Sequence, residues 1–242
     1  MKSKRLTVLL SSALALFGLS GCESTALQDI LASTNTGGTS AGLSSDTIAR
    51  GLKEALTVGT GRVVDNLGSN DGFFGSSEYR IPLPASLQKV KSAAGAVGLG
   101  SYFEELELKM NRAAEAATPK ARSLFVSAIS QLTFQDVMGI YQGEDNAATQ
   151  YLRGKMAAPL KEEMRPIINK SLAEVGAVKV FNDLIGRYNR LPLVEDIDAN
   201  LDEHVLGYAN QAIFAQLEDQ EAAIRKDPVA RSTALLRQVF GS

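Results

Sequence analysis

Polar side chains that could do chemistry gather on one face of a predicted helix over residues 101–117. Asn111, Arg112 and Glu115 lie within about one helical turn of each other. One hypothesis is a pocket lined by these three side chains. The alternative is a closed seam of hydrogen bonds between helices, because buried polar groups require partners. We favour the seam.

A second polar set lies near the C-terminus, on the helix predicted to end at about Lys226. Glu221 and Arg225 are four residues apart, in the order that favours an ion pair within a helix. Glu218 and Glu221 could act as general acid and base, although surface charge is the commoner explanation for such residues. Arg225 and Arg231 could hold an anionic group. We consider it more usual that they bind carbonyl groups at the helix end.

Composition narrows the remaining chemistry. The chain has one cysteine, one histidine and no tryptophan. His204 is therefore the one candidate for a histidine-based metal site or a serine–histidine pair, and a lone histidine is more often structural. Gly98-Leu99-Gly100 lacks the rest of a phosphate-loop pattern, and no nucleophile motif is present. We expect no cofactor and no metal, and we favour a protein that is not an enzyme.

The N-terminus predicts export. Lys2, Lys4 and Arg5 precede an apolar run over residues 6–19, which is typical of a secretory signal and too short to span a bilayer. The alternative is an uncleaved anchor helix. The run ends at Leu19-Ser20-Gly21-Cys22, which resembles the lipobox of bacterial lipoproteins.

The lipobox resemblance has consequences for location. It implies cleavage of residues 1–21 and attachment of acyl chains such as palmitate to Cys22. Two or more chains hold a protein stably at a membrane, whereas one is marginal. Glu23, rather than aspartate, weakly favours the outer membrane. We expect residues 22–45 to form a flexible tether, because residues 33–42 are small and polar.

Charge and length limit the functions open to the mature chain. The signal holds three of the 25 lysines and arginines and none of the 27 acidic residues, so the mature chain carries a net charge of about −5. Nucleic-acid binding needs basic patches and is not expected. Residues 46–242 are expected to form one domain.

Hydrophobic residues recur at helical spacing through that domain, and alternating strands are absent. We predict an all-α fold, a single bundle of about eight to ten helices. Ser101 with Glu104, and Thr133 with Asp136, resemble capping boxes. Asp196 or Asp198 is expected to begin the longest helix. Pro159 and Pro166 either kink one helix or divide it, and residues 68–84 form a loop that folds onto the domain.

Several ordered motifs identify a family resemblance that covers roughly residues 43–242. They are Ser45-Asp46 with Gly51–Leu56, Ile81–Pro84, Asn111–Glu115, Ala147–Thr149 followed by Tyr151, and Ile224-Arg225 with Val239–Gly241. Together they resemble the bacterial domain of unknown function 4197 family. The resemblance implies a helical envelope protein with a lipoprotein or secretory signal, and it implies no activity.

These observations predict an envelope lipoprotein on the periplasmic side of the membrane. The leading hypothesis is a non-catalytic module that binds a protein or small ligand while Cys22 holds it to the membrane. The alternatives are a carrier or sensor of an apolar ligand between its helices, and a hydrolase using Glu115, Glu218 or Glu221.

Overall fold

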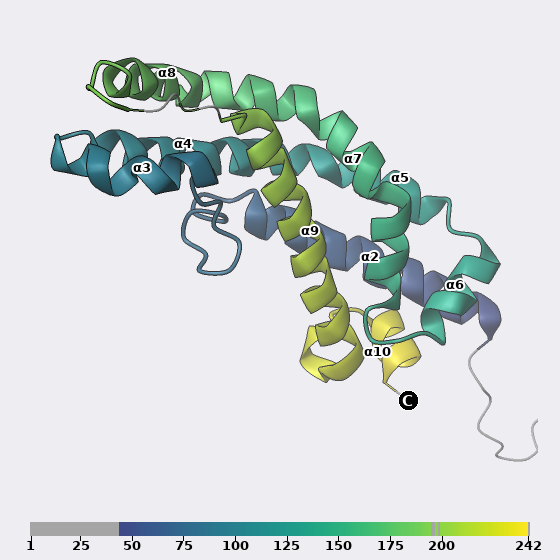
Figure 1. Ribbon diagram of the computed structural model, residues 1–242. Coiled ribbons are helices and arrows are strands. Elements are labelled where there is room, and N and C mark those ends of the chain that lie inside the picture. The colour runs from purple at the N-terminus through teal and green to yellow at the C-terminus, as the bar shows by residue number, and fades with distance from the viewer. Residues whose placement is uncertain (1–43, 195–196, 198, 242) are drawn as a thin grey trace, which may run out of the picture. The chain divides into compact units, whose positions relative to one another are not determined.

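Helices dominate the structure, which is a computed structural model that describes residues 44–194, 197 and 199–241 (Figure 1). Those residues contain nine α-helices and no strand, so the predicted all-α bundle is confirmed. The signal, Cys22 and the tether up to residue 43 lie outside the described residues. The elements are α2 (Ser45–Leu67), α3 (Ala85–Ala96), α4 (Gly100–Ala117), the 3₁₀ turn η1 (Thr118–Lys120), α5 (Ala121–Ser130), α6 (Phe134–Tyr141), α7 (Ala147–Glu174), α8 (Ala177–Tyr188), α9 (Leu201–Lys226), the 3₁₀ turn η2 (Pro228–Ala230) and α10 (Ala234–Phe240).

Side-chain caps begin some helices and not others. The predicted capping box at α6 is confirmed: Thr133 Oγ1 accepts from the N–H of Asp136 at 3.1 Å, and Asp136 Oδ2 accepts from the N–H of Thr133 at 2.9 Å. The box predicted at Ser101 and Glu104 is wrong, because α4 already begins at Gly100 and has no side-chain cap. Ser101 therefore lies inside the first turn of α4 and not at the cap position, from which its side chain would accept from a later N–H group.

The prediction that the longest helix begins at Asp196 or Asp198 is wrong. The longest helix is α7, with 28 residues, and the helix that follows those two positions is α9, which begins at Leu201 and has 26 residues. Asn200 caps α9 by accepting from the N–H of Glu203 at 2.9 Å, and Asp196 and Asp198 lie outside the described residues. Pro159 and Pro166 sit inside α7 on its exposed side, where carbonyls that lose an N–H partner can bind water. Among the helices that the structure describes, none combines the length and the apolar character that a membrane span requires.

The helices pack in an order that brings distant parts of the chain together. α4 lies along α7 and α8, while α9 crosses α7 and α2 (Figure 1). Phe73, Phe103, Phe125 and Phe214 are fully buried in the shared core. The rings of Phe125 and Phe214 meet edge to face, 5.8 Å apart, which joins α5 to α9.

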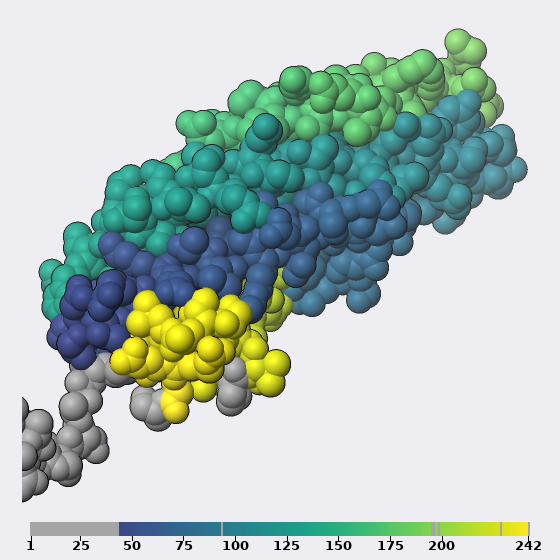
Figure 2. All heavy atoms as spheres, turned by 180° about the vertical axis from the view of Figure 1, so that it is seen from behind, coloured from purple at the N-terminus to yellow at the C-terminus, as the bar shows by residue number. Residues whose placement is uncertain are grey.

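The C-terminal helix α10 packs against α2 and α9, where Ala55, Ile224 and Leu236 form a second, smaller cluster of buried side chains. Figure 2 shows α10, in yellow, against α2, in purple and blue. Gly51 makes this approach close, because a Cβ at Gly51 would lie 2.4 Å from Val239 Cγ2. Valine is stiff about χ1, so it has little freedom to move aside.

We therefore expect Gly51→Ala to loosen α10. The overlap with Val239 should lower the free energy of unfolding by about 1–3 kcal/mol, measured by urea denaturation. Gly154→Ala is the matched control, because Gly154 is exposed within α7 and its added Cβ would meet no atom within 4 Å. That control should gain up to about 1 kcal/mol from helix propensity. Equal effects of both substitutions would contradict the close contact.

Candidate functional site

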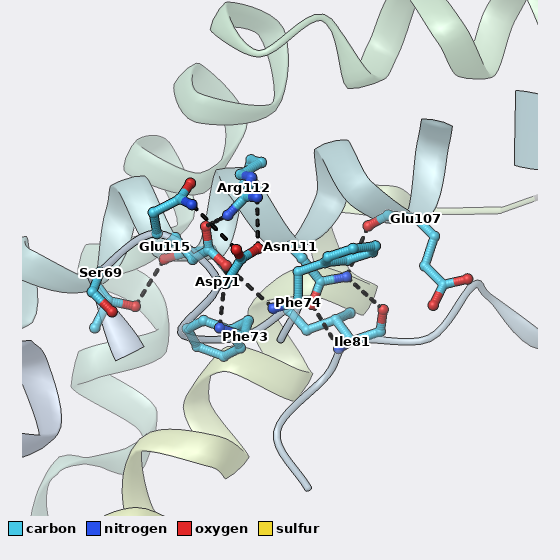
Figure 3. A network of polar contacts seen from close by, with 12 residues as sticks. Ser69, Asp71, Phe73, Phe74, Ile81, Glu107, Asn111, Arg112 and Glu115 are labelled. Carbon is cyan, nitrogen blue, oxygen red and sulfur yellow. Dashed lines mark hydrogen bonds and ion pairs between the residues drawn. The ribbon is translucent and has the colours of Figure 1, made fainter. Parts of the chain in front are cut away.

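Asn111 holds a loop rather than lining an open pocket. Its side chain is fully buried on α4 and pairs with the backbone of Ile81 (Figure 3). The N–H of Ile81 donates to Asn111 Oδ1 at 2.9 Å, and Asn111 Nδ2 donates to the carbonyl of Ile81 at 2.8 Å. Ile81 belongs to the connection over residues 68–84, here called the docking loop, which contains no strand or helix. Asn111 thus provides hydrogen-bond partners for the N–H and C=O groups of Ile81, which have none within a helix or strand.

Glu115, one turn further along α4, holds the other part of the docking loop. It is 4% exposed, and its Oε1 accepts from the N–H groups of Phe73 and Phe74, both at 3.2 Å. Its Oε2 accepts from Arg112 Nη1 at 2.6 Å. The carboxylate therefore has a donor on each oxygen, and its charge is balanced by the guanidinium.

Arg112 joins Glu115 to the tip of the docking loop. Its Nη2 donates to Asp71 Oδ1 at 2.7 Å, and the hydrogen bond to Glu115 is the main cause that raises the pKa of the guanidinium. Asp71 has φ 65°, a left-handed conformation that aspartate tolerates better than most residues. Arg112 and Glu115 thus form one network with Asp71, and Asn111 binds the same loop separately through Ile81. These partners belong to the docking loop, whereas the seam hypothesis placed them on another helix.

The docking loop is also bound to α9. The hydroxyl of Tyr79 donates to Asp219 Oδ2 at 2.6 Å. His204 Nε2 lies 2.7 Å from the carbonyl of Pro82, and it must carry the proton because a carbonyl only accepts. Burial lowers the pKa of His204 and outweighs this hydrogen bond, which raises it. His204 thus has a structural position, in which it connects the docking loop to α9.

Glu221 is a second buried carboxylate, and the interpretation of it as surface charge is wrong because it is only 7% exposed. Its Oε1 accepts from the N–H of Ala148 at 3.0 Å, and its Oε2 accepts from the N–H and the hydroxyl of Thr149, both at 2.8 Å. The first N–H groups of a helix have no partner inside the helix, and its N-terminus favours negative charge. Glu221, on α9, supplies an acceptor for these N–H groups and a negative charge at the N-terminus of α7.

Arg225 completes this second cluster. Its Nε and Nη2 donate to Glu221 Oε1 at 3.1 and 2.9 Å, which is the predicted pair within one helix. Its Nη2 also donates to the carbonyl of Ile140, near the end of α6, at 3.1 Å. The pair therefore connects α6, α7 and α9.

Two further predicted site residues, Glu218 on α9 and Arg231 after the end of α9, lie beside this cluster. Glu218 is partly exposed and accepts from Asn146 Nδ2 at 2.8 Å, with Arg153 Nη2 at 3.7 Å. Arg231 donates to the carbonyls of Ile224 and Arg225, at 3.0 and 2.8 Å. Arg231 thus satisfies the carbonyls at the end of α9, as the carbonyl-binding alternative expects.

The predicted residues therefore form two clusters that share no hydrogen bond or ion pair among the described residues. One contains Arg112 and Glu115, with Asn111 bound to the same docking loop, and the other contains Glu221 and Arg225 with their neighbours. Sequence reasoning missed Thr149 and the Tyr79–Asp219 bond. Thr149 lies in one of the family motifs, close to the start of a predicted helix. That position is the feature of the sequence that could have pointed to it. Within the described ranges, no three histidine, aspartate or glutamate side chains are grouped so as to hold a metal ion.

Comparison with known proteins gives a family without an activity. The family model described as "Protein of unknown function (DUF4197)" matches residues 42–241. No curated protein matches the chain, and no solved structure does.

The geometry of Glu221 predicts a stability effect. Glu221→Ala would leave Arg225 and two backbone N–H groups without their acceptor, so we expect a loss of about 3–5 kcal/mol. Glu218→Ala is the matched control on the same helix. Glu218 and its partners Asn146 and Arg153 are only partly buried, so we expect a loss below about 1 kcal/mol. Urea denaturation measures both. A loss for Glu221→Ala as small as that of its control would show that this carboxylate does not hold α7.

The environment of His204 predicts a pH dependence. The native state favours the neutral ring, so the unfolded state takes up a proton more readily, and stability should fall as the pH drops below the ordinary histidine pKa of 6.5. Ordinary aspartate and glutamate side chains titrate near pH 4, and His204 is the only histidine in the chain. Denaturation at pH 7.5 and pH 5.5 should show this loss, and His204→Gln should reduce it. If the free energy of unfolding of the variant fell with pH as steeply as that of the wild type, groups other than His204 would be the cause.

Proposed function

We propose, from the premise that the chain belongs to the domain of unknown function 4197 family, that it is a lipid-anchored, non-catalytic binding module in the bacterial envelope. In this proposal, acyl chains on Cys22 hold the protein at the periplasmic face of the outer membrane, and the helical domain binds a partner there.

The anchor part of the proposal is supported by the sequence before α2. The cationic start, the apolar run and Leu19-Ser20-Gly21-Cys22 together match a lipoprotein signal. The polar residues between Cys22 and α2 would let the domain move away from the membrane surface.

The non-catalytic part rests on one observation, the bonding of the two buried carboxylates. Glu115 and Glu221 each accept hydrogen bonds from two backbone N–H groups and pair with an arginine of the same helix. A general acid or base must instead reach a substrate proton. This bonding favours a structural role for both residues and weighs against the hydrolase alternative.

The apolar cavity between α2, α9 and α10 offers little room for the ligand of the carrier alternative. This cavity, lined by Leu52, Leu56, Leu217 and Phe240 among others, measures about 20 Å³. That is room for about one water molecule, whereas small-ligand sites are about 300–1,000 Å³. A module that acts through its outer surface fits this close packing better.

The experiment is lipid analysis of the full-length chain produced in a bacterium that processes lipoproteins. We expect a mature protein that begins at Cys22, carries acyl chains and sediments with outer-membrane vesicles in a density gradient. Cys22→Ser should lose both the lipid and the sedimentation, while the neighbouring Ser24→Ala should behave as wild type. Recovery of wild-type protein without lipid, or from the cytoplasm, would overturn the proposal.

A further inference from the structure

A surface hollow between the docking loop and α9 is separate from both carboxylate clusters. It measures about 170 Å³ and is lined by Glu78, Tyr79, Tyr208, Gln211, Ala212 and Ala215. The volume suits a small chemical group and not a whole lipid. Because one wall is the docking loop, the hollow exists only once that loop is bound to α9.

Both tyrosine rings of the hollow are held in place by neighbours. Tyr79 is partly buried, and its hydroxyl donates to Asp219 Oδ2 at 2.6 Å. Tyr208 is 39% exposed, and its ring packs against that of His204 with their centres 4.8 Å apart. Rings fixed before a ligand arrives lower the entropic cost of binding.

The charge around the hollow is negative. Asp219 and Glu78 both lie close enough to Tyr79 to raise the pKa of its hydroxyl, although burial is the larger cause. Neither carboxylate forms an ion pair with a lysine or arginine in the part of the chain that the structure describes. The nearest arginine in sequence, Arg80, is instead bonded to Glu107 at 2.8 Å and lies over the ring of Phe74. His204 adds no charge near neutral pH, because its pKa is lowered.

We propose that this hollow binds an organic cation, a protonated or quaternary alkylammonium group, between Tyr79 and Tyr208 and beside Glu78 and Asp219. Ammonium groups are attracted to the faces of aromatic rings and to carboxylates. A metal ion fits less well, since no metal-binding group of three such side chains occurs among the described residues. The organic cation would be a ligand of the binding module, so its assignment rests on that proposed function.

The ammonium group has two sources that share this chemistry, a free amine and a lysine side chain of a protein. Calorimetric titration of the purified full-length chain with choline tests the first, and titration with a lysine-rich peptide tests the second. The neutral control is 3,3-dimethylbutan-1-ol, which has the shape of choline without the charge. We expect saturable binding of choline or the peptide, and binding of the neutral alcohol that is weaker by about tenfold.

Variants assign the binding to the hollow. Glu78→Gln and Tyr208→Ala should each weaken it several-fold, and Asp219→Asn should also weaken it while keeping an acceptor for the hydroxyl of Tyr79. Glu163→Gln is the matched control, because Glu163 is exposed on α7 outside the hollow. Thermal denaturation checks that each variant folds.

Two results would overturn the inference. One is absence of saturable binding of either cation to wild-type protein. The other is equal binding of choline and the alcohol, or of wild type and Glu78→Gln. The lipid analysis of Cys22 does not depend on these titrations, so failure of the anchor and failure of the hollow would be told apart.

Discussion

The structure depends on satisfying backbone N–H groups that have no partner in their own element. Two carboxylates on two different helices do this in the same way. Glu115 binds two N–H groups of the docking loop, and Glu221 binds two at the start of α7. Each carboxylate also has an arginine on its own helix, at a spacing of three or four residues, which balances the buried charge. Without these acceptors, buried N–H groups would carry the full cost of desolvation.

The docking loop shows how such bonds position a surface. Phe73 and Ile81 are fully buried, so apolar burial attaches the loop, while Asn111 and Glu115 decide its path across α4. Its far side then reaches α9 through Tyr79 and Pro82. The loop therefore links two helices that are far apart in sequence, and the hollow beside Tyr208 is a product of that link.

The buried and the exposed polar residues differ in what they are free to bind. The buried polar residues that first attract attention as catalysts bind the protein's own backbone. The side chains that combine exposure, aromatic character and negative charge lie instead on the outer face of α9 and the docking loop. In the lipid-anchored module that we propose, this outer face would be the part that meets the partner.

The sequence by itself determined the fold class and the grouping of Asn111, Arg112 and Glu115, because helical periodicity and spacing are local properties. Local rules also found the capping box of α6, but they failed at Ser101, because α4 already begins at Gly100. Only the tertiary structure decided what the carboxylates do. Glu221 meets Thr149, 72 residues away, and Glu115 meets Phe73, 42 residues away. A pattern along the chain cannot show such a contact, since the contact exists only after the helices have packed.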